Sequence, residues 1–176
     1  SDLQAITNLL LKSGADIHYI NTIRKHLDGV KGGRLAAGWS PAEIQTLILS
    51  DVIGDDLDMI ASGPTVADPT TFEDAWKIVE KYQLTDAIPL SVLNVLKDGM
   101  VGKISETMKP AEFERLKVDN HLVGTNSLAA LAAKERAEEL GFLSEVLTTT
   151  LTRVNPALNG TVSVKKIIED ALCLSG

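Results

Sequence analysis

The sequence predicts an α/β fold with a parallel, helix-flanked (Rossmann-like) sheet, and two stretches carry that prediction. The apolar run Leu47–Leu49 ends abruptly at Ser50, which is typical of a short strand buried on both faces of a parallel sheet. The segment from Leu122 to Leu140 changes from a short apolar run to a helical pattern across a turn at 124–126. Together with a strand at Val146–Leu151, it would complete a right-handed βαβ unit.

Apolar periodicity and stop signals predict the helices before residue 100. They are expected at Asp2–Lys12, within Ile17–Leu35, at Phe72–Lys81 and from Pro89 to Leu96. Asn21 or Thr22 is expected to cap the second helix, and the turn Asp68–Thr71 is expected to cap the third. Asp98-Gly99 is expected to end the fourth. The charged segment Gly102–Asp119 lacks periodicity, so we interpret it as a surface connection and a subdomain seam.

Composition indicates a globular protein and excludes several classes. Of the 176 residues, 44% are hydrophobic and 23% charged, and no apolar run approaches the roughly 20 residues that span a bilayer. The net charge of −7 argues against broad nucleic-acid binding. A single cysteine, Cys173, permits no internal disulfide, and no signal peptide is visible. We therefore expect a cytoplasmic protein, either a monomer or a homo-oligomer.

An acidic cluster follows the predicted strand Leu47–Leu49. Asp51 stands where that strand ends, and Asp55, Asp56 and Asp58 follow it. Ligands of open α/β sheets bind beyond the carboxyl ends of the strands, and carboxylates suit Mg²⁺. The alternative is a solvated acidic turn. No metal-type spacing relates His18, His26 and His121, so a zinc site is not predicted.

Three further groups of residues suit an anion. Arg24, Lys25 and Lys31 lie near the Gly32-Gly33 pair, although the pattern matches no standard phosphate loop and a solvated basic helix face would look the same. The segment Ser62-Gly63-Pro64-Thr65 supplies hydroxyl donors and a close-approach glycine, or forms a simple turn. Asn126 opens the helix after 124–125, where free N–H groups favour phosphate, or it serves only as the N-cap.

The two central motifs resemble one known family. INTIRKHLDGVKGGRLA and LILSDVIGDDLDMIASGPTVADPTTF are similar to segments of the glycerate 2-kinases (MOFRL-type glycerate kinases, often labelled hydroxypyruvate reductases). HLVGTNSL and LGFLSEVLTTTL resemble two further segments of that family. The resemblance runs almost continuously from Leu3 to Leu151. The family's upstream Gly-rich loop and downstream Gly-Arg motif are not in this sequence, and 153–166 departs from its pattern. Residues 1–176 therefore resemble the central part of the large domain of a two-domain enzyme.

The resemblance implies an ATP-dependent and Mg²⁺-dependent phosphorylation of D-glycerate to 2-phosphoglycerate by the intact enzyme, with the isolated chain expected to be inactive. It implies catalytic roles for Asp51, Asp55, Arg24 and Lys25, with Asp51 and Asp55 as metal ligands. Substrate and nucleotide contacts are then expected from the following residues: Asn21, Lys31, Gly32, Gly33, Ser62, Gly63, Thr65 and Asn126.

Two alternatives from other classes remain. One is an NAD(P)H-dependent hydroxypyruvate reductase, which would need a dinucleotide fingerprint that this sequence lacks. The other is a non-catalytic domain that binds small anions or another subunit.

Overall fold

The computed structural model describes residues 1–146. Residues 147–151 of the expected strand, the segment 153–166 and Cys173 lie outside the described residues. Within 1–146 the chain is an α/β structure, which confirms the predicted fold class. No helix in this part of the chain is both long enough and apolar enough to cross a bilayer.

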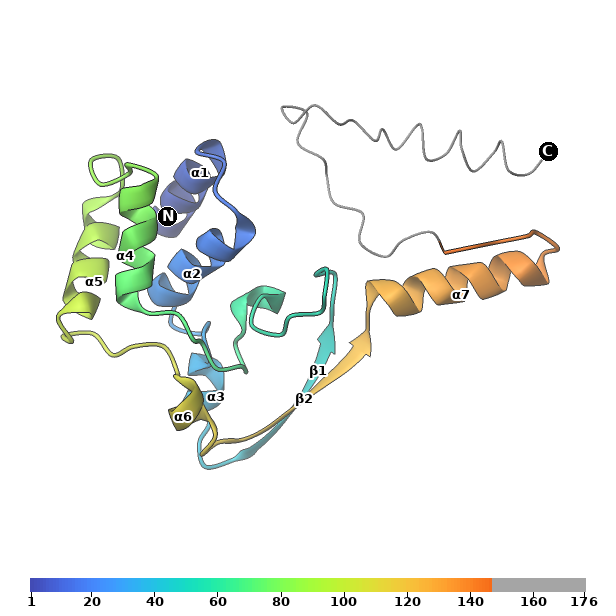
Figure 1. The fold of residues 1–176 in the computed structure, drawn as a ribbon. Helices are drawn as coiled ribbons and strands as arrows, with labels where there is room; N and C mark the ends of the chain where they lie inside the picture. The colour runs from blue at the N-terminus through green and yellow to red at the C-terminus, as the bar shows by residue number, and fades with distance from the viewer. Residues whose placement is uncertain (147–176) are drawn as a thin grey trace.

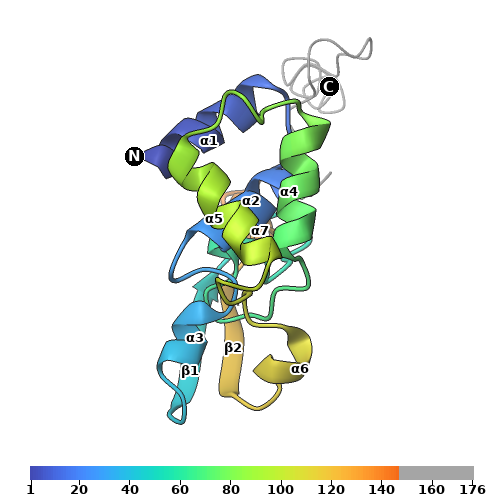
Figure 2. The ribbon, with the colours of Figure 1, turned by 90° about the vertical axis from the view of Figure 1, so that its left-hand side faces the viewer.

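Four helices form the hydrophobic core: α1 (Asp2–Lys12), α2 (Ile17–Leu27), α4 (Phe72–Lys81) and α5 (Leu90–Met100). They cluster at one end of the molecule (Figures 1 and 2). Their apolar stripes, spaced three and four residues apart, meet in the middle and bury Ile6, Leu10, Ile23, Phe72, Val79 and Leu96 completely or almost so. The helices α1 and α4 match their predicted bounds.

A two-stranded parallel sheet runs away from this helical cluster (Figure 1). Strand β1 (Glu43–Leu49) pairs with β2 (Lys117–Gly124), with Glu43 opposite Lys117 and an irregularity between Ile48 and Leu49. The short helix α3 (Arg34–Gly38) precedes β1, and two further short helices, the 3-10 turn η1 (Ile60–Ser62) and α6 (Pro110–Phe113), lie between the strands in sequence. The last described helix, α7 (Asn126–Glu139), continues outward from β2 (Figure 1).

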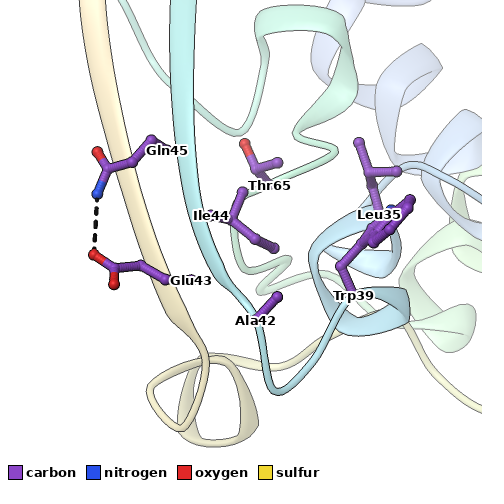
Figure 3. A pocket seen from close by; sticks show the side chains of 7 residues that line it. All are labelled: Leu35, Trp39, Ala42, Glu43, Ile44, Gln45 and Thr65. Atoms are coloured by element: carbon purple, nitrogen blue, oxygen red, sulfur yellow. Dashed lines mark hydrogen bonds between the residues drawn. The ribbon is translucent and has the colours of Figure 1, made fainter.

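The strand β1 is not buried on both faces, which corrects one expectation. Leu47 and Leu49 are 72% and 75% exposed, and burial alternates along the strand. The apolar run is therefore present where it was predicted, but no helix among residues 1–146 covers that face of the sheet. The other face is partly covered by α3 and by the loop around Thr65 (Figure 3).

Three local expectations are wrong for identifiable reasons. The helix α2 begins at Ile17, because the Asp16 side chain accepts from the His18 N–H and so caps the helix five residues before Asn21, the first of the two expected caps. The segment 102–119 is not merely a surface connection. Thr107 is fully buried. The Met108 N–H donates to the Gly32 carbonyl, and the Met108 carbonyl accepts from the Asp68 N–H. The subdomain seam placed there stays a prediction.

The third error concerns α5, which continues through Gly99 to Met100 instead of breaking there. Gly99 is buried against the ring of Phe72, and a Cβ at this position would lie 2.3 Å from Phe72 Cγ. The glycine therefore serves close helix packing rather than helix termination.

We expect Gly99→Ala to destabilise the fold by about 1–3 kcal/mol, because the buried ring has no room to retreat. Alanine normally stabilises an exposed helix position relative to glycine, so the sign of the change is informative. Urea denaturation measures the effect. Gly38→Ala is the matched control, since a Cβ there meets nothing within 4 Å. Equal stability of the two variants would contradict the packing argument.

Candidate functional site

A cavity of about 680 Å³ lies between α2 and the loop that follows β1. Its polar lining comes from His18, Asn21, Arg24, Asp51, Asp56 and Ser62. Four of these six residues, Asn21, Arg24, Asp51 and Ser62, were predicted as site residues from the sequence. The loop lies beyond the carboxyl end of β1, which is where open α/β sheets bind ligands.

The helix α2 contributes three polar side chains to one wall of this cavity. His18, Asn21 and Arg24 are spaced three residues apart, so they follow one face of the helix. His18 was considered only as a zinc ligand in the sequence, and its spacing from Asn21 is the signal that would have found it.

The ends of the two strands bring Asp51 and Asn126 together, as the parallel arrangement predicts. The Ser50 N–H donates to the Gly124 carbonyl at 2.8 Å, which fixes the residue before Asp51 against the end of β2. The Asn126 side-chain amide then donates to the Asp51 carbonyl at 3.4 Å. Asn126 is not the N-cap of α7, because Thr125 holds that position and accepts from the Leu128 N–H.

A left-handed stretch of backbone forms another part of the cavity wall. Ala61, Ser62 and Gly63 have φ values of 52°, 62° and 60°, a conformation that non-glycine residues adopt only at a cost. The Ser62 hydroxyl donates to Asn21 Oδ1 at 3.0 Å, and Asn21 Nδ2 lies 3.5 Å from the Met59 carbonyl. These contacts hold the strained stretch against α2.

The basic turn formed by Lys31, Gly32 and Gly33 holds the stretch 61–63 through hydrogen bonds to its carbonyls. Lys31 Nζ donates to the Ala61 carbonyl at 3.2 Å, and the N–H groups of Gly32 and Gly33 donate to the Ser62 and Gly63 carbonyls at 3.1 and 2.8 Å. Three consecutive donors thus meet three consecutive carbonyls. The structure brings Lys31, Gly32 and Gly33 to the loop but not to the lining of the cavity.

Lys25 also points away from the cavity. Its side chain is 2% exposed, and its ammonium lies 3.0 Å from Asp58 Oδ2 and 3.4 Å from Asp68 Oδ1. Asp58 is therefore an ion-pair partner and not part of a solvated turn, which corrects one alternative for the acidic cluster.

Asp68 gives this ion-paired cluster a pH dependence. Burial raises the pKa of Asp68, but hydrogen bonds from Thr70 and the charge of Lys25 outweigh burial and hold the pKa below its ordinary value of 3.8. The resulting stabilisation is fully present above that ordinary pKa and is lost as the pH falls through the lower pKa of the folded state.

We expect Asp68→Asn to lower the Tm at neutral pH, and the difference from the unmodified protein to shrink as the pH falls below the ordinary carboxyl pKa of 3.8. Thermal melts followed by circular dichroism from about pH 2 to pH 7 measure this. A Tm difference that stays constant over the whole range would contradict the assignment.

Thr65 has a structural position outside this cavity. Its hydroxyl donates to Asn120 Oδ1 at 2.8 Å, and Asn120 Nδ2 donates back to the Thr65 carbonyl at 2.9 Å, so the pair fastens the loop to β2. Thr65 lines a second cavity of about 350 Å³ between α3 and β1, where Leu35, Trp39 and Ile44 face one another (Figure 3). Glu43 and Gln45 point to the other side of β1, and no cluster of charged groups converges there (Figure 3).

Asp56, not Asp55, shares the first cavity with Asp51. Asp55 has a left-handed φ of 56° and does not line the cavity. Among residues 1–146, no group of three or more His, Cys, Asp or Glu side chains is arranged to hold a metal ion. Two carboxylates are still compatible with Mg²⁺, which in phosphoryl-transfer sites takes one or two carboxylates and completes its shell with substrate phosphates and water. The cavity combines these oxygen donors with a guanidinium that can pair with an anion.

Comparison with known proteins identifies relatives of this site. Residues 1–97 match the family model described as "Domain of unknown function (DUF4147)". The glycerate 2-kinase of Pyrococcus horikoshii is 49% identical over 150 residues, which are 85% of this chain and 33% of that protein. A putative hydroxypyruvate reductase of Agrobacterium vitis is 44% identical over 84% of this chain and 31% of its own length. The chain spans about a third of the length of these relatives.

A solved structure agrees with these relatives. The crystal structure of glycerate kinase from Thermotoga maritima superimposes with a TM-score of 0.68 at 44% identity, covering 85% of this chain and 33% of that one.

Proposed function

Because this chain belongs to the DUF4147 family and is similar to proteins named glycerate kinase over most of its length, we propose that the complete protein phosphorylates D-glycerate with ATP and yields 2-phosphoglycerate. The family resemblance stated from the motifs is thereby confirmed. The observation that carries the proposal is the cavity at the end of β1. It holds Arg24 from α2 and two carboxylates, Asp51 and Asp56, from the loop after β1.

Phosphoryl transfer suits such a cavity because it depends on positioning and on charge neutralisation more than on covalent chemistry. Arg24 is proposed to bind an anionic group, either the carboxylate of glycerate or a phosphate. Asn21 and Ser62, which already bond to each other, are proposed to present hydrogen-bonding groups at a fixed separation. Asn126 is proposed to orient Asp51 through its backbone carbonyl.

The proposed cofactors are ATP and Mg²⁺. Asp51 and Asp56 would hold the metal ion, and the original assignment to Asp51 and Asp55 is revised on the lining of the cavity. When bound, Mg²⁺ neutralises charge on the phosphate oxygens. Asp51 is also proposed as the general base that accepts the proton of the attacking hydroxyl.

A second candidate, the reduction of hydroxypyruvate by NAD(P)H, is favoured only by the name given to the Agrobacterium vitis relative. The sequence has no G-x-G-x-x-G motif to bind a dinucleotide.

The two candidates separate in one experiment on the complete protein. We expect 2-phosphoglycerate to form from D-glycerate, ATP and Mg²⁺, measured by an enolase-coupled assay that consumes the 2-isomer. Chelation of Mg²⁺ by EDTA should abolish the product. NADH oxidation with hydroxypyruvate, in a protein that leaves glycerate and ATP unchanged, would reject the kinase and support the reductase.

A further inference from the structure

We propose that Lys25 is a positioning residue, whose buried ammonium fixes the cavity loop 51–63 against α2 by neutralising Asp58 and Asp68. The effect on turnover rests on the proposed function, whereas the effect on the loop does not. The sequence alone suggested that Lys25 contacts substrate, and the geometry points to a different role.

One ammonium joins three segments of the chain. Lys25 belongs to α2, Asp58 lies in the loop after β1, and Asp68 precedes α4. Asp68 is fully buried and also accepts hydrogen bonds from the N–H and hydroxyl of Thr70, at 3.0 and 2.7 Å. Within residues 1–146, Asp68 Oδ2 has no hydrogen-bond partner, so Lys25 is the cation that compensates its charge most directly.

The position of Asp58 is transmitted to the cavity wall through its neighbours. The next residue, Met59, lines the cavity, and its carbonyl faces Asn21 Nδ2. Gly63 packs directly on the backbone of Asp58, where a Cβ would lie 3.2 Å from Asp58 Cα. Anchoring Asp58 therefore fixes both ends of the strained stretch that carries Ser62.

Two adjacent residues of α2 therefore have different roles. Arg24 lines the cavity, and Lys25 faces the interior with 2% of its side chain exposed. A group this enclosed by carboxylates does not reach a ligand in the cavity without breaking both ion pairs. Its contribution to turnover is consequently made through the loop.

A positioning role for Lys25 predicts a charge dependence that direct contact with substrate does not. Removing the ammonium alone leaves two carboxylates close together, one of them fully buried, and such uncompensated charge is strongly destabilising. Removing all three charges leaves an apolar side chain at position 25 and neutral amides at positions 58 and 68, whose oxygens can still accept hydrogen bonds. Loss of Lys25 should therefore be rescued by neutralising its partners.

The test compares Lys25→Met with the triple variant Lys25→Met/Asp58→Asn/Asp68→Asn in the complete protein. We expect Lys25→Met to speed amide hydrogen exchange in 51–63 roughly tenfold or more, and to lower kcat more than it raises KM for D-glycerate. The triple variant should be rescued to within about threefold of Asp58→Asn in both loop exchange and kcat, because both variants lack the Lys25–Asp58 anchor and neither leaves a buried charge unpaired. Peptides from α1 and α5 should exchange at unchanged rates throughout.

If Lys25→Met does not fold, Asp58→Asn gives the same information, because it removes the anchor in the loop and leaves the buried Lys25–Asp68 pair intact. It should speed exchange in 51–63, and the exposed control Asp86→Asn should not. Unchanged loop exchange in Lys25→Met or Asp58→Asn would overturn the proposal. So would a triple variant that matches Asp58→Asn in loop exchange but is inactive where Asp58→Asn turns over, since that result requires Lys25 to contact substrate. An unmodified protein without kinase activity rejects the proposed function, while the exchange data still decide the role of Lys25.

Discussion

Asp51→Asn should lower kcat for glycerate phosphorylation by roughly 10²-fold or more, while the Tm changes little. The expected size follows from position. Ser50 is tied to Gly124 at the end of β2, and the Asn126 amide reaches the Asp51 carbonyl, so the carboxylate starts from a fixed backbone. A preorganised charge contributes most to a reaction whose barrier is largely electrostatic. Asparagine keeps the shape and removes the charge.

The matched control for Asp51→Asn is Asp86→Asn, an exposed carboxylate outside the cavity lining. Asp58→Asn is unsuitable as a control, because Asp58 pairs with Lys25. The measurement is kcat at saturating ATP and Mg²⁺, after circular dichroism has shown that each variant is folded. Near-normal kcat in Asp51→Asn, together with a large loss in Asp56→Asn, would contradict the role of Asp51 and would assign the metal ligand or the general base to Asp56.

Arg24→Met should weaken the binding of the anionic substrate by about 10- to 100-fold, because a charge-assisted hydrogen bond contributes roughly 1.5–3 kcal/mol. Methionine keeps most of the length and apolar stem of the side chain while removing the guanidinium. The exposed Arg115→Met is the control, since it removes the same charge outside the cavity.

Calorimetric titration of Arg24→Met separates the two ligands. Weaker binding of D-glycerate with unchanged binding of ATP assigns Arg24 to the carboxylate, and the reverse assigns it to a phosphate. Unchanged affinity for both would remove Arg24 from the site.

Several features of the fold were available from the sequence because they depend on local interactions. Apolar spacing located α1 and α4. The turn Asp68–Thr71 predicted a cap for α4, and in the structure Thr71 caps this helix in a capping box. The apolar runs also placed Asp51 and Asn126 just after two strands, and the pairing of β1 with β2 in the structure makes those strand ends neighbours. The motifs also indicated the family, which the comparisons confirm.

The tertiary structure decided which of the predicted charges face a ligand. Arg24 and Lys25 are adjacent and equally basic, yet one lines the cavity and the other is enclosed by Asp58 and Asp68, 33 and 43 residues away. Gly99 looked like a helix stop until its contact with Phe72 showed a packing role.

In each of these cases the deciding partner is distant in the chain. Periodicity and capping signals report only on the nearest residues, so they fix where helices and strands form. The direction in which a side chain points, and whether its charge is neutralised, depend on segments that meet only after the chain has folded. The sequence by itself therefore determined the family of this protein and the approximate positions of its long helices, and the packing of α2 against the loop after β1 determined the cavity.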